Sequence, residues 1–288
     1  MIDRQARDLP LDAHLHTDLS HDSAVPIDAY GQLAVQRGIA ELAITDHVDF
    51  APDAPGFGAT TFQQRERVVR DAGERWAEHG VAIRFGVEIT WDPRYASEIR
   101  DHLARHAYDF VIGSVHVYRD SPYAADQVAG WVTGRPLADI VAPYFDTVVS
   151  GARSGLFDAM GHIDFVKRFL VPHVMPADLA AAPELYEPIL GALVESGTAL
   201  EINTSGLRSP AGETYPSPAI VARFHALGGR AITIGSDAHG AESFSWALAD
   251  GYRSAVEAGF EALTFRRGRE RATIDLSGAP NVIAAPSL

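Results

Sequence analysis

The segment from residue 12 to residue 23, DAHLHTDLSHDS, carries three histidines and three aspartates in twelve positions. His14 and His16 are two residues apart, so both imidazoles face the same side if this segment is a β-strand. Imidazole nitrogens and carboxylate oxygens are ligands of zinc, manganese and iron. A surface strand can carry such a pair without binding anything, so interpretation as a metal site depends on the rest of the chain.

Polar residues of the same kinds recur at the ends of short apolar runs. These runs are rich in Val, Ile, Ala and Phe and are bounded by Gly, Pro, Asp or Ser, which predicts strands. The seven predicted strands are Leu11–His16, Glu41–His47, Val81–Ile89, Phe110–His116, Ala159–Asp164, Ala199–Asn203 and Ala231–Asp237. Each strand ends in, or is directly followed by, residues able to bind a metal ion. The metal-binding candidates at these ends include His14, His16, His47, Glu88, His116, His162, Asp237 and His239.

Helical patterns separate the predicted strands and determine how these side chains are positioned. The predicted helices are Phe62–His79, Leu137–Ser154, Pro183–Ser196, Pro218–Leu227 and Ser243–Ala258. Alternation of strands and helices predicts a parallel sheet with helices outside, and seven repeats favour a distorted TIM-like (β/α)7 barrel. We expect residues 1–288 to form one domain, with residues 268–288 as a peripheral tail. The carboxyl ends of barrel strands meet on one face, so the candidates should lie together.

The number of candidate ligands is too large for a single ion. Two or three divalent ions, zinc, manganese or iron, fit the count better when a carboxylate bridges them. Glu88 is the expected bridge, because it is an isolated acid at the end of an apolar strand.

Composition excludes several other functions. The net charge of −14 disfavours binding to a nucleic-acid backbone, and the absence of cysteine excludes a thiolate zinc site or a cysteine nucleophile. The N-terminal residues MIDRQARDLP contain no apolar signal-peptide core, and no run of about 18 apolar residues occurs. We therefore expect a cytoplasmic protein that binds neither membrane nor nucleic acid, whereas the oligomeric state cannot be predicted.

The ordered motifs HLH, TDH, GVEI, GSVH, GHID, EINTSG and SDAH resemble those of the polymerase-and-histidinol-phosphatase (PHP) superfamily, over residues 11–240. The segments HLHTDLSHDS, GSVH, GHID and EINTSGLR are most similar to the histidinol-phosphate phosphatases. The resemblance implies a PHP-type seven-stranded barrel with a trinuclear metal centre. It also implies hydrolysis of L-histidinol phosphate, in histidine biosynthesis, by a hydroxide between the metal ions. Two alternatives are another small phosphomonoester, such as a nucleotide or sugar phosphate, and a metal-binding module without catalysis.

The same resemblance assigns ligands to three ions, residue by residue. The first ion would be held by His14, His16, Glu88 and Asp237, and the second by Glu88, His116 and His162. The third would be held by His47, His239 and a residue of the opening segment, either Asp22 or its neighbour His21. We expect Asp22, because Ser20, Asp22 and Ser23 match the HxHSxxSxDS pattern of relatives that use an aspartate here.

Several further residues are expected to serve the reaction. Arg168 and Arg208 follow the fifth and sixth strands, and a guanidinium can bind two phosphate oxygens at once. Asp237 and His239 are the candidates for assisting the leaving oxygen. Asp46 and Asp164 are expected to orient ligand imidazoles, and Lys167 to face solvent.

Overall fold

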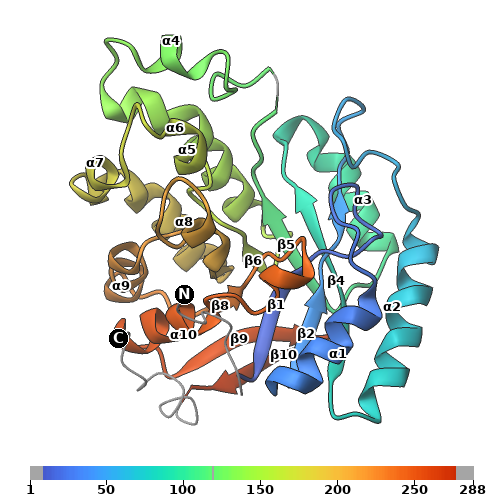
Figure 1. The fold of residues 1–288 in the computed structure, drawn as a ribbon. Coiled ribbons are helices and arrows are strands. Elements are labelled where there is room, and N and C mark those ends of the chain that lie inside the picture. The colour runs from blue at the N-terminus through green and yellow to red at the C-terminus, as the bar shows by residue number, and fades with distance from the viewer. Residues whose placement is uncertain (1–8, 119, 277–288) are drawn as a thin grey trace.

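The computed structural model describes residues 9–118 and 120–276, and within them a parallel sheet forms the centre of the molecule (Figure 1). Seven strands pair side by side in the order β1-β2-β4-β5-β6-β7-β8, and the short strand β3 pairs with β4 outside this series. Consecutive elements of a chain usually pack side by side, which favours this order. The strands are β1 (Leu11–Leu15), β2 (Glu41–Ile44), β4 (Ala82–Thr90), β5 (Phe110–Ser114), β6 (Ala159–Met160), β7 (Ala199–Asn203) and β8 (Ile232–Gly235).

The first and last strands of this series meet and nearly close the sheet. Leu15 and Ala238 form a parallel bridge just beyond β8. The backbone N–H of His16 donates to the carbonyl of Ala238 at 3.0 Å, and that of Asp237 donates to the carbonyl of His14 at 2.9 Å. The predicted distorted seven-stranded barrel is therefore confirmed.

The second predicted strand is interrupted. It divides into β2 and the short β3 (His47–Val48), which pairs with the far half of β4 and places His47 opposite Glu88. Between them, the hydroxyl of Thr45 bonds to the backbone N–H and carbonyl of Leu15, at 3.1 and 3.2 Å. The backbone ladder continues through Thr45, whose N–H donates to the carbonyl of Leu15 at 2.8 Å and whose carbonyl accepts from the N–H of Glu88 at 3.0 Å.

The helices lie outside the barrel (Figure 1). Leu137–Ser154 forms a helix with the predicted bounds, whereas the last predicted helix begins five residues late. Ser245 and Ala247 have φ of 49° and 54°, which a right-handed helix cannot contain. None of the helices in the described ranges combines the length and apolar character needed to cross a bilayer. They are α1 (Ile27–Arg37), α2 (Phe62–Ala77), α3 (Ala96–Arg105), α4 (Val128–Val132), α5 (Leu137–Ser154), α6 (Lys167–Leu170), α7 (Pro176–Ala180), α8 (Glu187–Ser196), α9 (Pro218–Ala226) and α10 (Leu248–Glu257).

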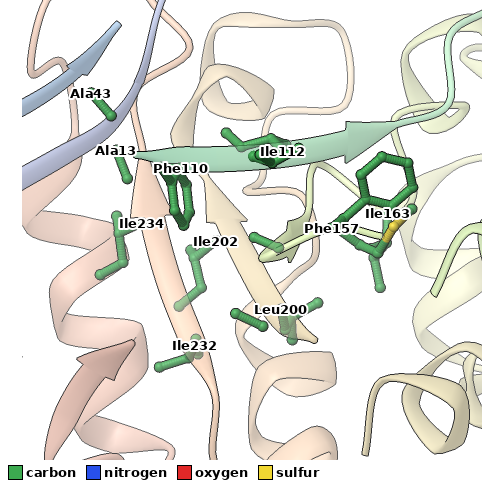
Figure 2. Close-up of a cluster of buried hydrophobic side chains, with 14 of the residues drawn as sticks. Ala13, Ala43, Phe110, Ile112, Phe157, Ile163, Leu200, Ile202, Ile232 and Ile234 are labelled. Carbon is green, nitrogen blue, oxygen red and sulfur yellow. The ribbon is translucent and has the colours of Figure 1, made fainter. Parts of the chain in front are cut away.

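Apolar side chains from several strands form the core. Figure 2 shows Phe110, Ile202 and Ile234, from β5, β7 and β8, close together, and all three are buried. Each such side chain contributes about 1.5–3 kcal/mol to folding when it leaves water. Along β7, Leu200 and Ile202 alternate with the polar residues Glu201 and Asn203, so one face of the strand packs and the other carries polar groups.

A hairpin of β9 (Ala262–Arg267) and β10 (Glu270–Asp275) follows the last helix. Part of the tail expected to be peripheral is thus a strand, and Leu276, just after it, is only 2% exposed. Arg267 forms an ion pair with Glu41, at the start of β2, because the hairpin lies near the amino ends of the barrel strands. Residues 277–288 of the expected tail lie outside the described residues.

Candidate metal centre

All nine expected ligands lie together at the carboxyl ends of the barrel strands. Seven of them line a cavity of about 520 Å³, whereas His14 and His16 are not among its lining residues. The cavity is lined by Asp22, His47, Glu88, His116, His162, Phe165, Arg168, Ser205, Arg208, Ser209, Pro210, Asp237, His239 and Ser243.

Four of the ligand atoms converge on one point. The Nε2 atoms of His14 and His16 are 3.0 Å apart, and each is 3.3 Å from Oε2 of Glu88. Oδ1 of Asp237 lies 3.7 Å from the first nitrogen and 3.4 Å from the second. Ligands around a tetrahedral ion with bonds of 2.0–2.1 Å are separated by about 3.4 Å, so the distances among these atoms are compatible with such an ion.

Glu88 lies at the middle of the cluster. Its Oε2 is also 3.0 Å from Nδ1 of His47, while Oε1 is 3.0 Å from Nε2 of His162 and 3.4 Å from Nε2 of His116. Burial alone would raise the pKa of this carboxyl, but His14, His47 and His116 hold it well below its usual range. Oε2 is buried and has no hydrogen-bond partner among the described residues, although imidazole nitrogens surround it. Bound cations would satisfy this oxygen, and a carboxylate facing two groups of nitrogens is able to bridge them.

Asp22, rather than His21, faces the remaining ligands. Oδ2 of Asp22 lies 3.2 Å from Nε2 of His47 and 3.1 Å from Nε2 of His239. The ring of His21 is 5.3 Å from that of His47, and its Nε2 is 3.8 Å from the same Asp22 oxygen. The group His16, Asp22, His47 and His239 has ligand atoms within 4.8 Å of one another, which favours Asp22 as the third-site ligand.

The ligand imidazoles are oriented by residues other than those we expected. Oε1 of Glu201 is 2.6 Å from Nδ1 of His14, and its Oε2 accepts a bond from the backbone N–H of His162 at 2.8 Å. The hydroxyls of Ser20 and Thr90 lie 3.2 and 2.9 Å from Nδ1 of His16 and His116. A partner on the second ring nitrogen fixes the tautomer and leaves Nε2 free to bind metal. In the sequence, alternation with Ile202 places Glu201 on one face of its strand with Asn203, but this pattern does not predict contact with a ligand imidazole.

Asp46 and Asp164 do not contact a ligand imidazole, so that prediction was wrong. Asp46 accepts bonds from the backbone and hydroxyl of Thr17, at 2.6 and 2.9 Å, and so fixes the turn after His16. Asp164 instead accepts a bond from Tyr186 and pairs with Lys167.

Two ligands have an unusual backbone conformation. His162 and Asp237 have φ of 21° and 52°, in the range where side chains other than glycine are strained. Such conformations persist where the surrounding structure holds them, and they concentrate at functional sites. Both side chains face the cluster, where Nε2 of His162 contacts Glu88 and Oδ1 of Asp237 contacts His16.

Two arginines border the cavity, and they differ in exposure. Nη2 of Arg208 donates to the carbonyls of Ser236 and Asp237 at 3.0 and 3.2 Å. Its Nη1 is buried and has no hydrogen-bond partner in the part of the chain that the structure describes. Arg168 is exposed on the cavity rim. Lys167, which we expected in solvent, is buried instead.

The electrostatics of the cluster depend on which imidazoles have carboxylate neighbours. Burial lowers the pKa of His47, but Glu88 and Asp22 raise it to about 10. The pKa of His14 is likewise raised, against the effect of burial, by Glu201, Glu88 and Asp237. Since metal ligands must lose their protons, bound cations would replace the protons that balance these carboxylates. The donor set, which contains only nitrogen and oxygen, fits divalent transition metals.

Comparison with known proteins identifies the family. The PHP domain family model matches residues 12–205. A probable histidinol-phosphatase of Deinococcus radiodurans is 32% identical over 260 residues, which are 88% of this chain and 96% of that protein. A histidinol-phosphatase of Lactococcus lactis subsp. lactis is 28% identical, over 80% of this chain and 84% of its own.

A solved structure shares the fold. The crystal structure of histidinol phosphate phosphatase from Lactococcus lactis subsp. lactis, complexed with zinc, L-histidinol and phosphate, superposes with a TM-score of 0.78. The two chains are 24% identical, and the superposition covers 91% of this chain and 98% of the other. The family match, the relatives and the cluster of nitrogen and oxygen ligands all agree with divalent-metal binding. This chain therefore belongs to the PHP family.

Proposed function

We propose that this protein is a metal-dependent phosphomonoesterase that hydrolyses L-histidinol phosphate to L-histidinol and phosphate. The observation that carries the proposal is Glu88, whose two oxygens face five imidazoles beside a cavity that also contains Arg208. The names of the relatives supply the substrate.

We propose two or three bound ions, of zinc, manganese or iron. His14, His16, Glu88 and Asp237 would hold the first, Glu88, His116 and His162 the second, and Asp22, His47 and His239 the third. Such ions, when bound, lower the pKa of water and offset the negative charge of a phosphoryl group. A carboxylate shared by two ions would keep them close enough to act on one phosphate.

The two arginines would bind the phosphoryl group. The free Nη1 of Arg208 is held in place by the two bonds that its Nη2 makes to backbone carbonyls. A buried donor without a partner costs free energy, and a phosphate oxygen would supply that partner. Arg168, on the rim, would add a weaker and solvent-screened contact.

Asp237 and His239 would assist the leaving oxygen. Oδ1 of Asp237 faces the ligand imidazoles, while its Oδ2 lies 3.3 Å from Nδ2 of Asn203 and 3.2 Å from the hydroxyl of Ser205. The His239 side chain is 33% exposed and lines the cavity. Burial lowers the pKa of His239, but Asp22 and Asp237 raise it above its usual value in the absence of metal. Because a ligand imidazole gives up that proton, His239 would assist in the loaded protein by holding the third ion beside the leaving oxygen.

The test combines metal removal with a substrate panel. Purified protein is stripped with a chelator, its metal content is measured, and phosphate release from L-histidinol phosphate is followed before and after zinc, manganese or iron is restored. We expect turnover to disappear and return with the metal. A higher kcat/KM for a nucleotide or sugar phosphate would mean that this compound, and not L-histidinol phosphate, is the substrate. Undiminished turnover by metal-free protein would overturn the metal-dependent mechanism.

A further inference from the structure

Lys167 is a fully buried lysine close to the cavity, and the reaction proposed above gives it no task. Its side chain is 1% exposed, and Nζ lies 2.7 Å from Oδ2 of Asp164. Nζ also lies 2.6 Å from Oε1 of Glu213 and donates to the carbonyl of Thr214 at 3.2 Å. A buried ammonium costs several kcal/mol unless it is paired, so these three partners explain how the site tolerates it.

The partners of Lys167 belong to the two segments that carry the cavity arginines. Asp164 and Lys167 lie in the segment after β6, and Arg168 is the next residue. Glu213 and Thr214 lie in the loop after β7, which also contains Arg208. Lys167 therefore bonds to Asp164 in its own segment and to Glu213 and Thr214 in the other, and so joins the two segments directly.

The loop after β7 is compact, so a contact at Glu213 affects the whole of it. Asn203 and Tyr215 close its base with two backbone bonds of 2.8 and 2.9 Å. Inside it, a Cβ on Gly206 would lie only 2.2 Å from the carbonyl oxygen of Glu213, so the two halves of the loop touch. The hydroxyls of Ser209 and Tyr215 are 2.6 Å apart and tie the same halves together. Movement of Glu213 would therefore shift the part of the loop that carries Arg208.

We propose that Lys167 is a positioning residue for phosphate binding. By holding Glu213 and Thr214 against Asp164, it sets the separation between Arg168 and Arg208, and thereby the affinity of the cavity for a phosphoryl group. The inference rests on the proposed function. None of the nine expected ligands is bonded to Nζ in the described structure, so metal binding is expected to be independent of Lys167.

The first test is Glu213→Ala. The Glu213 side chain is 27% exposed and Lys167 keeps its partner Asp164, so the variant is expected to fold. We expect KM and the inhibition constant of inorganic phosphate to rise roughly tenfold, as for the loss of one charge-assisted contact, with kcat and metal content close to wild type. Glu187→Ala is the matched control, because it removes an exposed ion pair with Arg223 on α8 and α9.

The second test removes both fully buried charges with the double variant Lys167→Met/Asp164→Asn, which leaves only the Glu213 carboxylate, 27% exposed, without its ammonium partner. The same rise in KM and phosphate inhibition constant is expected, at unchanged metal content. Unchanged phosphate affinity in both variants, or an equal fall of kcat and metal content, would overturn the inference. If the wild type hydrolyses no phosphomonoester, the proposed function fails. Calorimetric titration of metal-loaded wild type and Glu213→Ala with inorganic phosphate would then decide the positioning role separately.

Discussion

Glu201→Gln tests whether this metal centre depends on a carboxylate that does not contact the ions. Glu201 and His14 are both completely buried, and Oε1 lies 2.6 Å from Nδ1 of the ring. Oε2 accepts bonds from the backbone N–H of His162 and from Nδ2 of Asn203, at 2.8 and 3.1 Å. The carboxylate therefore serves three donors, whereas a glutamine has only one accepting oxygen.

Either orientation of the glutamine damages the site. If its oxygen faces His14, the amide NH2 meets the donors of His162 and Asn203, which leaves a buried N–H without an acceptor and costs about 1–3 kcal/mol. If its NH2 faces His14, the proton of the ring moves to Nε2, which can then no longer bind metal. Loss of such an orienting contact reduces metal affinity roughly 10- to 100-fold, or about 1.4–2.8 kcal/mol.

The assay is a competition titration with a chelating dye, followed by kcat/KM measurements at rising metal concentration. We expect weaker metal binding and activity that excess metal largely restores. Glu41→Gln is the matched control, because Glu41 is also a buried strand glutamate but pairs with Arg84 and Arg267 at the other end of the barrel. Metal affinity of Glu201→Gln within twofold of wild type would refute the orienting role.

Three further substitutions probe other parts of the molecule. Glu88→Gln removes one of the two oxygens that face the imidazoles, and kcat/KM should fall roughly a hundredfold or more together with measured metal content, since each ion contributes several kcal/mol. Arg208→Ala should lower kcat/KM roughly 10- to 100-fold at unchanged metal content, and an equal loss of metal would contradict its role in phosphate binding. Burial, with nearby positive charges, lowers the pKa of His102 from 6.5 to about 4. Because the folded pKa is the lower one, the unfolded chain binds more protons between these values, and stability is lost as the pH falls through them. The His102→Gln variant should lack this pH-dependent loss, which amounts to no more than about 2 kcal/mol in the free energy of unfolding after allowance for partial exposure. Identical urea-unfolding profiles of the two proteins between pH 7 and pH 4 would contradict this prediction.

The arrangement of the candidate ligands followed from the sequence because two simple rules determine it. Strand–helix alternation predicts a parallel barrel, and the carboxyl ends of its strands must meet on one face. His14, Glu88 and Asp237 are far apart in the chain, yet the barrel brings them together without any further information. The central place of Glu88 was likewise expected from its isolation at the end of an apolar run.

The predictions that were wrong concern residues whose burial or bonding depends on distant partners, which local sequence patterns do not reveal. Lys167 is buried because Glu213, 46 positions away, reaches it, and no local pattern predicts that contact. Asp46 lies where the second predicted strand is interrupted, between β2 and β3, and there it accepts a bond from Thr17. The hairpin strand β10 alternates weakly and is mostly exposed, so it resembled a tail.

The barrel contains both a well-packed apolar core and a buried cluster of polar and charged groups, and the second opposes folding while the first favours it. The faces packed against helices consist of well-buried apolar groups, whereas the carboxyl ends enclose His14, His16, Glu88 and Glu201 with almost no access to water. Without cations, opposite charges and protons must balance these groups, and one oxygen of Glu88 still has no hydrogen-bond partner in the described structure. Cations that bind only the folded protein would supply the missing charge and stabilise the fold by mass action. The same groups that make the metal-free barrel costly to fold are therefore the ones that give the cavity its affinity for metal.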